Sequence, residues 1–138
     1  ISTISVYARN DTPGADETAA TGTTTEPDNE DRTAMSRNYG PLKALSEKEA
    51  EKAFPGRTTV IRPGLIVGPG DLSDRFTYWP VRLRKGGEVL APGHPTDPVQ
   101  YVDARDLSEF AIRCCENETY GVYNVTGPAT PISIAEML

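Results

Sequence analysis

The sequence predicts an α/β fold in which a helix connects two strands of a parallel sheet. Residues Ile1 to Ala8 alternate and are rich in β-branched side chains, which favours a buried strand. A helix is predicted over residues 39–53, where apolar residues recur at helical spacing before Phe54-Pro55-Gly56 ends it. Residues 58–67 form a second apolar run. A strand, a helix and a strand with a connection of this length imply a parallel pair joined by a right-handed crossover.

Residues 9–38, between the first strand and the helix, are rich in Thr, Asp, Glu, Gly and Pro and lack apolar periodicity. A long surface loop is therefore expected. A connection of this length is uncommon unless it is functional or disordered. In the helix that follows, four apolar residues are expected to face the core: Leu42, Leu45, Ala50 and Ala53. Glu47 and the charged residues near it are expected to face water.

Proline and glycine mark the end of the second strand. Pro63 cannot donate a hydrogen bond to a sheet, so the bonding pattern is expected to break near it. Gly64, Gly68 and Gly70 follow with prolines among them, and no helix is signalled at their spacing. They are interpreted as a loop after a strand and not as a phosphate-binding turn.

Shorter elements are expected in the second half of the chain. A short helix within residues 75–87 would end at glycine, and short strands are predicted at 88–91 and 98–102. Asp103 is placed to cap a further helix, which is followed by a strand over residues 121–126 and a last helix. The apolar residues of the capped helix keep helical spacing: Leu107, Phe110, Ala111 and Cys114.

Composition excludes several classes of function. The 138 residues are 37% hydrophobic, enough for one modest core. The net charge is −6 and the pI is about 4.8, with Lys and Arg scattered, which argues against nucleic acids and anionic membranes as partners. No apolar stretch approaches the roughly 20 residues that span a bilayer, and a cytoplasmic protein is the default expectation. Adjacent Cys114 and Cys115 are expected to be free thiols, and the lone His94 has no ligand-like spacing around it.

Tyr39 and Lys43 are the residues best suited to chemistry. A spacing of four places them on one helical face. A phenol, whose pKa is ordinarily about 10, exchanges a proton at neutral pH only if something stabilises its anion, and a lysine ammonium does so. The hydroxyl of Thr3 would supply a third contact. Alone, this spacing also occurs on many solvated helices that have no part in catalysis.

Four motifs occur in a fixed order along the chain. They are Ser2 to Ala8, Tyr39 to Lys43, Arg62 to Pro69 and Gln100 to Leu107. In this order they resemble the extended short-chain dehydrogenase/reductase superfamily, of the NAD-dependent epimerase/dehydratase type, and the resemblance extends from Ile1 to about Pro128.

The resemblance implies the C-terminal part of a Rossmann-like parallel sheet with a small irregular substrate-side lobe. Residues 1–70 would be the second half of the Rossmann-like domain, with residues 9–38 as a long polar loop. Residues 71–138 would be mainly the lobe, with returning sheet elements. The Gly-rich nucleotide-binding turn of that family is missing, so the chain is expected to be a piece of a longer protein.

The resemblance also implies roles for individual residues. Tyr39 would be the acid/base for a substrate oxygen while hydride moves to or from a nicotinamide carbon. Lys43 would lower the pKa of Tyr39 and bind the nicotinamide ribose, and Thr3 would orient the substrate oxygen. The cofactor would be NAD or NADP, bordered by three further residues: Pro63, Gly64 and Val67. Ala8 stands where the family motif has glycine.

A small-molecule substrate is implied, with five candidate contacts: Tyr7, Leu65, Arg75, Tyr78 and Trp79. The aromatic side chains among them would line a less polar pocket or, as is commoner, anchor the small lobe. Sugar-nucleotide members of the family often carry Asn at the position of Leu65 and Arg at the position of Asp97. These departures weaken an assignment as a UDP- or dTDP-sugar epimerase, although Arg75, Arg82 or Arg84 could replace the missing guanidinium.

The first functional hypothesis is an NAD(P)-dependent oxidoreductase, epimerase or dehydratase that transfers hydride to or from a carbonyl or hydroxyl carbon. The isolated piece would be inactive. The alternative is a non-catalytic Rossmann-like binding or assembly protein, which the joint presence of Thr3, Tyr39 and Lys43 disfavours. An unrelated binding module would require the four motifs to be coincidence. The resemblance is also compatible with a homodimer through the helix that carries Tyr39.

Overall fold

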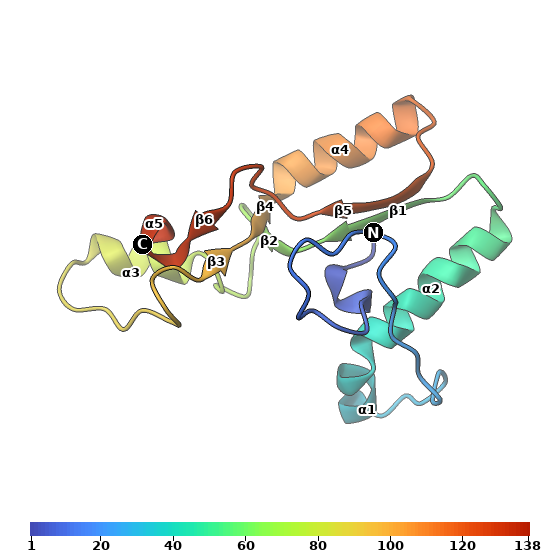
Figure 1. Cartoon of the computed structure of the whole chain (residues 1–138), viewed down its shortest axis with the longest axis horizontal. Coiled ribbons are helices and arrows are strands. Elements are labelled where there is room, and N and C mark those ends of the chain that lie inside the picture. The colour runs from blue at the N-terminus through green and yellow to red at the C-terminus, as the bar shows by residue number, and fades with distance from the viewer.

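The computed structural model describes residues 1–138 and shows short helices and strands joined by long irregular segments (Figure 1). The elements in chain order are η1 (Ile4–Val6), α1 (Arg32–Arg37), α2 (Tyr39–Ala53), β1 (Thr59–Pro63), β2 (Leu65–Val67), α3 (Tyr78–Arg84), β3 (Pro98–Val99), β4 (Tyr101–Asp103), α4 (Ala104–Glu116), β5 (Gly121–Val125), β6 (Ile132–Ser133) and α5 (Ile134–Met137). None of the helices is both long enough and apolar enough to cross a bilayer.

Two parallel strand pairs form the centre of the molecule. Strand β1 pairs with β5, and β2 pairs with β4, both in parallel. Helix α4 lies along one side of the β1–β5 pair and α2 along the other (Figure 1). Helix α4 connects β4 to β5, which belong to different strand pairs. The parallel pair predicted between residues 1–8 and 58–67 is not formed, because residues 4–6 turn into η1. This arrangement confirms the predicted α/β class and is that of a partial Rossmann-like fold.

The hydrophobic core lies between α4 and the strands. Ile61, Val102 and Leu107 are buried against one another, and Phe110 and Val125 pack on them. The predicted apolar face of α4 is therefore confirmed. Eleven of the 138 residues are buried, so the structure depends on a few contacts more than on a large core.

Helix α4 begins where the sequence predicts. The Asp103 carboxylate accepts a hydrogen bond from the backbone N–H of Arg105 at 2.8 Å, which satisfies an amide that has no partner within the helix. The guanidinium of Arg105 donates two further bonds to the same carboxylate and, with that amide, lowers the pKa of Asp103 to about 2. Asp103 is therefore an ionised cap over the whole working range of pH.

The strand predicted over Ile1 to Ala8 is wrong beyond its first residues. The N–H of Ser2 donates to the carbonyl of Ile61 at 2.7 Å, but the chain then turns into the single 3₁₀ turn η1. The Thr3 hydroxyl accepts from the N–H of Ser5 at 3.1 Å. This local bond offers the backbone an alternative to the sheet, which is why a β-rich composition did not produce a strand.

The long polar segment is irregular over most of its length, as predicted, but it ends in a helix that the sequence analysis missed. Helix α1 begins after Asp31, whose carboxylate accepts from the N–H groups of Thr33 and Ala34 at 3.0 Å each. Nearer its start, the segment forms an antiparallel bridge between Tyr7 and Thr21. This bridge ties the middle of the segment to the residue that follows η1.

Helix α2 has the predicted bounds but buries a different face. Gly40 and Ala44 are buried, whereas Leu45 is 38% exposed. Glu47, which was expected to face water, is instead half-buried and paired with Arg62. The reason is that α2 packs against η1, where small side chains allow the two backbones to approach.

The second predicted strand is split, as expected, at the Pro63-Gly64 step. The part before Gly64 pairs with β5 and the part after it pairs with β4. A strand at residues 88–91 is absent, and the one predicted at 98–102 is divided into β3 and β4. Glycine and proline flank residues 88–91 and leave this stretch without a partner strand.

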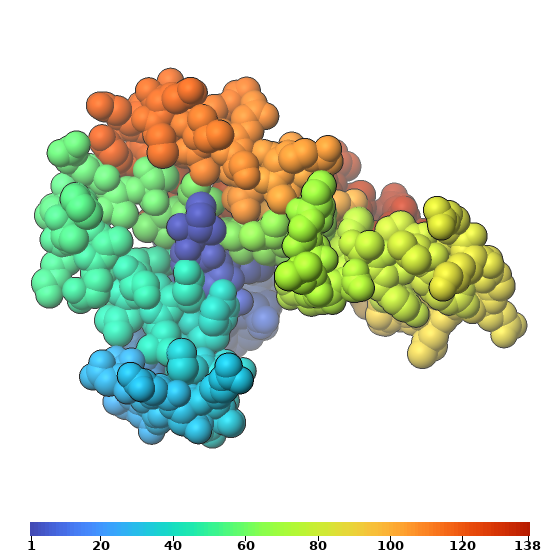
Figure 2. Space-filling view, turned by 180° about the vertical axis from the view of Figure 1, so that it is seen from behind, coloured from blue at the N-terminus to red at the C-terminus, as the bar shows by residue number.

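The short helix predicted within residues 75–87 is present as α3. It lies in a segment that projects away from the body of the molecule (Figure 2). Strand β3 pairs antiparallel with β6, which connects this projection to the end of the chain. Phe76 contacts Tyr101 with ring centroids 4.8 Å apart and anchors the start of the projection to β4.

Replacement of Gly40 by alanine tests the close packing of α2 on η1. A Cβ at this position would collide with the backbone carbonyl of Ser5. Although alanine normally favours a helix over glycine, Gly40→Ala is expected to lower the free energy of unfolding by about 1–3 kcal/mol. Urea denaturation measures the effect, with Lys48→Ala on the exposed face of α2 as control. Equal stability of the two variants would contradict the close contact.

Candidate functional site

Some of the residues expected to carry chemistry lie around one pocket. It has a volume of about 340 Å³ and lies where η1, the first turn of α2 and the β1–β2 junction meet. Six of the residues proposed from the sequence line it: Thr3, Tyr39, Pro63, Gly64, Leu65 and Arg75. The pocket therefore brings together the chain around η1, the start of α2, the β1–β2 junction and the segment before α3.

Thr3 and Tyr39, which both carry hydroxyl groups, line this pocket. The Thr3 hydroxyl contacts the Ser5 hydroxyl at 3.2 Å while it caps η1, so its position is fixed by the turn. Tyr39 is 51% exposed, and its phenol makes no hydrogen bond within the chain. The phenol is consequently available to a ligand oxygen.

Lys43 lies one helical turn after Tyr39 but is directed elsewhere. Its ammonium donates to the carbonyl of Ile1 at 2.9 Å and borders a smaller cavity of about 120 Å³. Ser2 lines both this cavity and the Tyr39 pocket, and its buried hydroxyl has no hydrogen-bond partner. Ser2 was not identified from the sequence, because an isolated serine in an apolar run carries no signal of its own.

The remaining predicted residues are not in the Tyr39 pocket. Val67 is buried in β2 opposite Asp103. Tyr7 borders a separate recess of about 690 Å³ between the start of the polar loop and the end of β5. Tyr78 and Trp79 contact each other edge to face, 5.0 Å between centroids, on the projecting α3.

A buried ion pair behind the pocket was missed by the sequence analysis. Arg62 is 5% exposed, and its Nη2 and Nε donate to the two carboxylate oxygens of Glu47 at 2.6 and 3.1 Å. Its Nη1 donates to the Tyr7 hydroxyl at 3.0 Å, and that hydroxyl donates to Asn124 Oδ1 at 2.7 Å. The guanidinium also lies 5.0 Å from the centre of the Tyr7 ring. An arginine within an apolar strand was the available signal, because such a residue requires a buried acceptor.

The polar loop joins this network through Glu17. Its carboxylate accepts from the backbone N–H of Asn124 at 2.6 Å, and its carbonyl accepts from Arg62 at 3.4 Å. Glu17 lies in the segment that was expected to be a long surface loop. The contacts with Arg62 and Asn124 are instead what fixes the loop on the sheet.

The charge state of Glu47 follows from its surroundings. Burial raises the pKa of this carboxyl, but the hydrogen bonds and charge of Arg62 and the charge of Lys43 outweigh burial, and the net pKa is below its ordinary value. The Ser2 hydroxyl lies beside the carboxylate and adds to this lowering, although it falls short of regular hydrogen-bond geometry. Glu47 is therefore ionised at neutral pH, and each of its carboxylate oxygens accepts a hydrogen bond from the Arg62 guanidinium.

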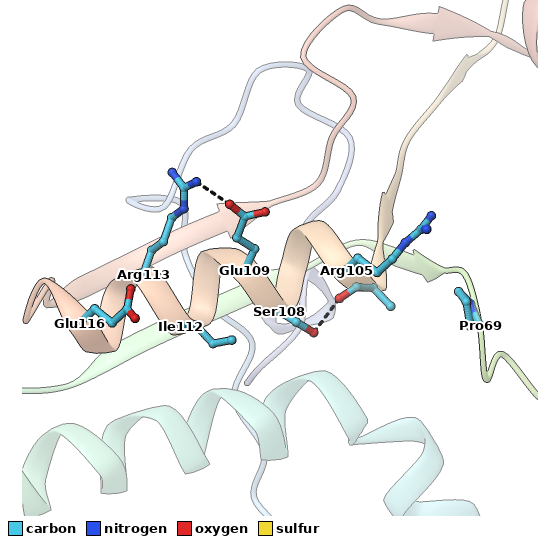
Figure 3. Close-up of a pocket in the computed structure, with 8 residues that line it drawn as sticks. Pro69, Arg105, Ser108, Glu109, Ile112, Arg113 and Glu116 are labelled. Atoms are coloured by element: carbon cyan, nitrogen blue, oxygen red, sulfur yellow. Dashed lines mark hydrogen bonds and ion pairs between the residues drawn. The ribbon is translucent and has the colours of Figure 1, made fainter.

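A second hollow, of about 570 Å³, extends along the outer face of α4 and contains none of the predicted site residues (Figure 3). Arg113 pairs with Glu109 along the helix, and the Ser108 hydroxyl donates to the carbonyl of Ala104 at 2.7 Å. Arg105 is held by Asp103. Because these ion pairs are local to α4 and its cap, and none of the residues proposed for chemistry lines this hollow, the Tyr39 pocket remains the candidate site.

Comparison with known proteins supports the fold. No protein-family model and no curated protein matches the sequence. The structure is similar to the crystal structure of a protein described as a putative epimerase from Burkholderia cenocepacia J2315, with a TM-score of 0.66 and 19% sequence identity. The similarity covers 99% of this chain and 42% of that protein, so the chain spans less than half of its length. At this identity the similarity establishes the fold alone.

Removal of Glu47 tests the energetic weight of the buried pair. Glu47→Leu would leave the Arg62 guanidinium buried without its counter-charge and is expected to lower the free energy of unfolding by about 3–5 kcal/mol. The double variant Glu47→Leu/Arg62→Met is expected to recover much of this loss, because no charge then remains buried. Glu49→Leu, in the exposed Glu49–Lys52 pair, is the matched control and should change stability by less than about 1 kcal/mol. A double variant no more stable than Glu47→Leu would contradict the pairing.

The same pair predicts a pH dependence. Because the pKa of Glu47 is lower in the folded chain than its ordinary 4.5, the pair stabilises the fold above that pH. This stability is lost as the pH falls through the folded pKa. Denaturation measured from neutral to acidic pH should therefore show a steeper decline for the wild type than for Glu47→Leu/Arg62→Met. Parallel declines would show that Glu47 contributes nothing to acid sensitivity.

Proposed function

We propose that this chain is the C-terminal part of an enzyme of the extended short-chain dehydrogenase/reductase type, of the NAD-dependent epimerase/dehydratase kind. Its reaction transfers hydride to or from a carbonyl or hydroxyl carbon of a small molecule. The observation that carries the proposal is that Thr3, Tyr39 and the Pro63-Gly64-Leu65 junction line one pocket. The similarity of fold to an epimerase-like protein supports it.

The pocket provides the groups that such a reaction requires. The phenol of Tyr39 would give a proton to, or take one from, a substrate oxygen, and the Thr3 hydroxyl would hold the same oxygen. The ammonium of Lys43, one turn along the same helix, would stabilise the phenolate and bind a ribose hydroxyl once released from the Ile1 carbonyl.

The residues present fit the nicotinamide end of NAD or NADP. Ser2 also lines the pocket, but its buried hydroxyl lies beside the Glu47 carboxylate, so it is not counted among the groups that would contact the cofactor. The Pro63 ring and Gly64, which has no side chain, provide a wall against which a flat ring could lie. The cofactor would supply or accept the hydride. The pyrophosphate would be held outside these residues, because the chain contains no Gly-rich turn that leads from a strand into a helix.

One observation favours the non-catalytic alternative. The ammonium of Lys43 is bound by the Ile1 carbonyl and borders a cavity separate from the one that Tyr39 lines. In a binding or assembly protein, Lys43 would keep this bond and Tyr39 would be a surface residue. The two functions predict different effects on activity when only the phenol oxygen of Tyr39 is removed.

Tyr39→Phe in the full-length protein that contains this chain tests the proposal. The reaction rate with a panel of ketones and aldehydes, followed by the absorbance of reduced nicotinamide, should fall about 10²–10⁴-fold, because the acid/base is lost. The melting temperature should stay unchanged, because the phenol is half exposed and makes no hydrogen bond within the chain.

Lys43→Met should also slow the reaction and, unlike Tyr39→Phe, should weaken cofactor binding. Lys48→Ala, on the exposed face of α2, is the control for both variants. If Tyr39→Phe retains nearly full activity at an unchanged melting temperature, the tyrosine is structural and the non-catalytic function becomes the better proposal.

A further inference from the structure

Arg75 is the sole charged side chain among the residues that line the Tyr39 pocket. We propose that Arg75 determines specificity by binding an anionic group of the substrate, a carboxylate or a phosphate, while Thr3 and Tyr39 hold the reacting oxygen. This inference rests on the proposed function and narrows it to anionic carbonyl or hydroxyl compounds.

The structure orients Arg75 through neighbours that leave its outer nitrogens free. Its Nε donates to the Ser73 hydroxyl at 3.1 Å, and that hydroxyl donates to the Asp71 carboxylate at 2.5 Å. The N–H of Ser73 binds the same carboxylate oxygen at 2.9 Å. The Ser73 hydroxyl and amide, and then the charge of Arg75, lower the pKa of Asp71, so this acceptor is ionised. Neither Nη nitrogen of Arg75 has a partner within the chain, and a carboxylate or phosphate accepts such a pair of donors.

The structure also distinguishes Arg75 from the two other arginines that were candidates for anion binding. Arg82 has both of its Nη groups engaged, by the carbonyls of Gly86 at 2.9 Å and Glu88 at 2.5 Å. Arg84 is on α3 and does not line the pocket. Asp97, which stands at the position of the family's arginine, does not line the pocket either, and its carboxylate accepts a hydrogen bond from the N–H of His94 at 2.7 Å.

The composition of the pocket adds to the preference. No aspartate, glutamate or lysine lines it, so the charge of Arg75 is not offset at the site. Ile4, Leu65 and Ile66 provide apolar walls beside Arg75, whose own side chain is exposed and accessible to a ligand. A volume of about 340 Å³ suits a compact ligand that places its anion at Arg75 and its oxygen at Tyr39.

Two matched pairs of carbonyl compounds test the inference by calorimetric binding to the full-length protein that contains this chain. The pairs are dihydroxyacetone phosphate with dihydroxyacetone, and pyruvate with pyruvamide. The anionic member of at least one pair should bind about ten- to a hundredfold more tightly than its neutral partner. The pair with the larger ratio distinguishes a phosphate from a carboxylate.

Arg75→Gln should remove this preference and leave the neutral compounds unaffected, whereas the matched control Arg84→Gln should retain it. The inference is overturned if the wild type binds neither anion, if it binds both members of each pair alike, or if Arg84→Gln loses as much affinity as Arg75→Gln. Failure of the proposed function has a different signature. An anion preference that depends on Arg75, together with full activity of Tyr39→Phe, would mean that the pocket binds anions but does not carry the reaction.

Discussion

The buried pair of Arg62 and Glu47 is the contact on which the rest of this small structure depends. It joins the end of β1 to the middle of α2, and through Tyr7 and Glu17 it also holds the turn after η1 and the polar loop. Two buried charges cost several kcal/mol to desolvate, and the cost is offset only when every donor and acceptor is satisfied. With few buried apolar residues, the molecule has little else to fix the position of α2 relative to β1.

This constraint explains how the candidate site is positioned. Tyr39 begins α2, and Pro63 follows directly after Arg62, so the pair fixes both walls of the pocket at once. The contact of Gly40 with the Ser5 carbonyl then sets the distance between Tyr39 and Thr3. The groups proposed for chemistry are thus held by helix, strand and turn backbones, and little of their position depends on loops.

Local signals in the sequence predicted some of these features and could not predict others. The bounds of α2, the break at Pro63 and the Asp103 cap follow from interactions within a few residues, and all three were found. The 3₁₀ turn of η1 replaced a strand because the Thr3 side chain competes with the sheet for backbone N–H groups, an effect that β-branched composition conceals. Glu47 was assigned to water because its partner Arg62 is distant in the sequence, and the position of Arg62 in an apolar strand indicates a buried acceptor without showing which residue it is. For the site, the motifs identified Thr3, Tyr39 and the Pro63 junction, but spacing alone could not show that Tyr78 and Trp79 belong to a projecting helix.

The pocket has walls of two different kinds. Thr3, Tyr39 and Pro63 come from the body of the molecule, which the Arg62–Glu47 pair holds together, whereas Arg75 comes from the segment that leads into the projecting α3. Arg75 is oriented only by Ser73 and Asp71, both in its own segment, so its position does not depend on the buried pair. A change in that segment can therefore alter which ligand is held without disturbing the groups proposed to act on it. In a fold that serves many reactions, this separation lets one arrangement of acid/base residues act on substrates of different charge.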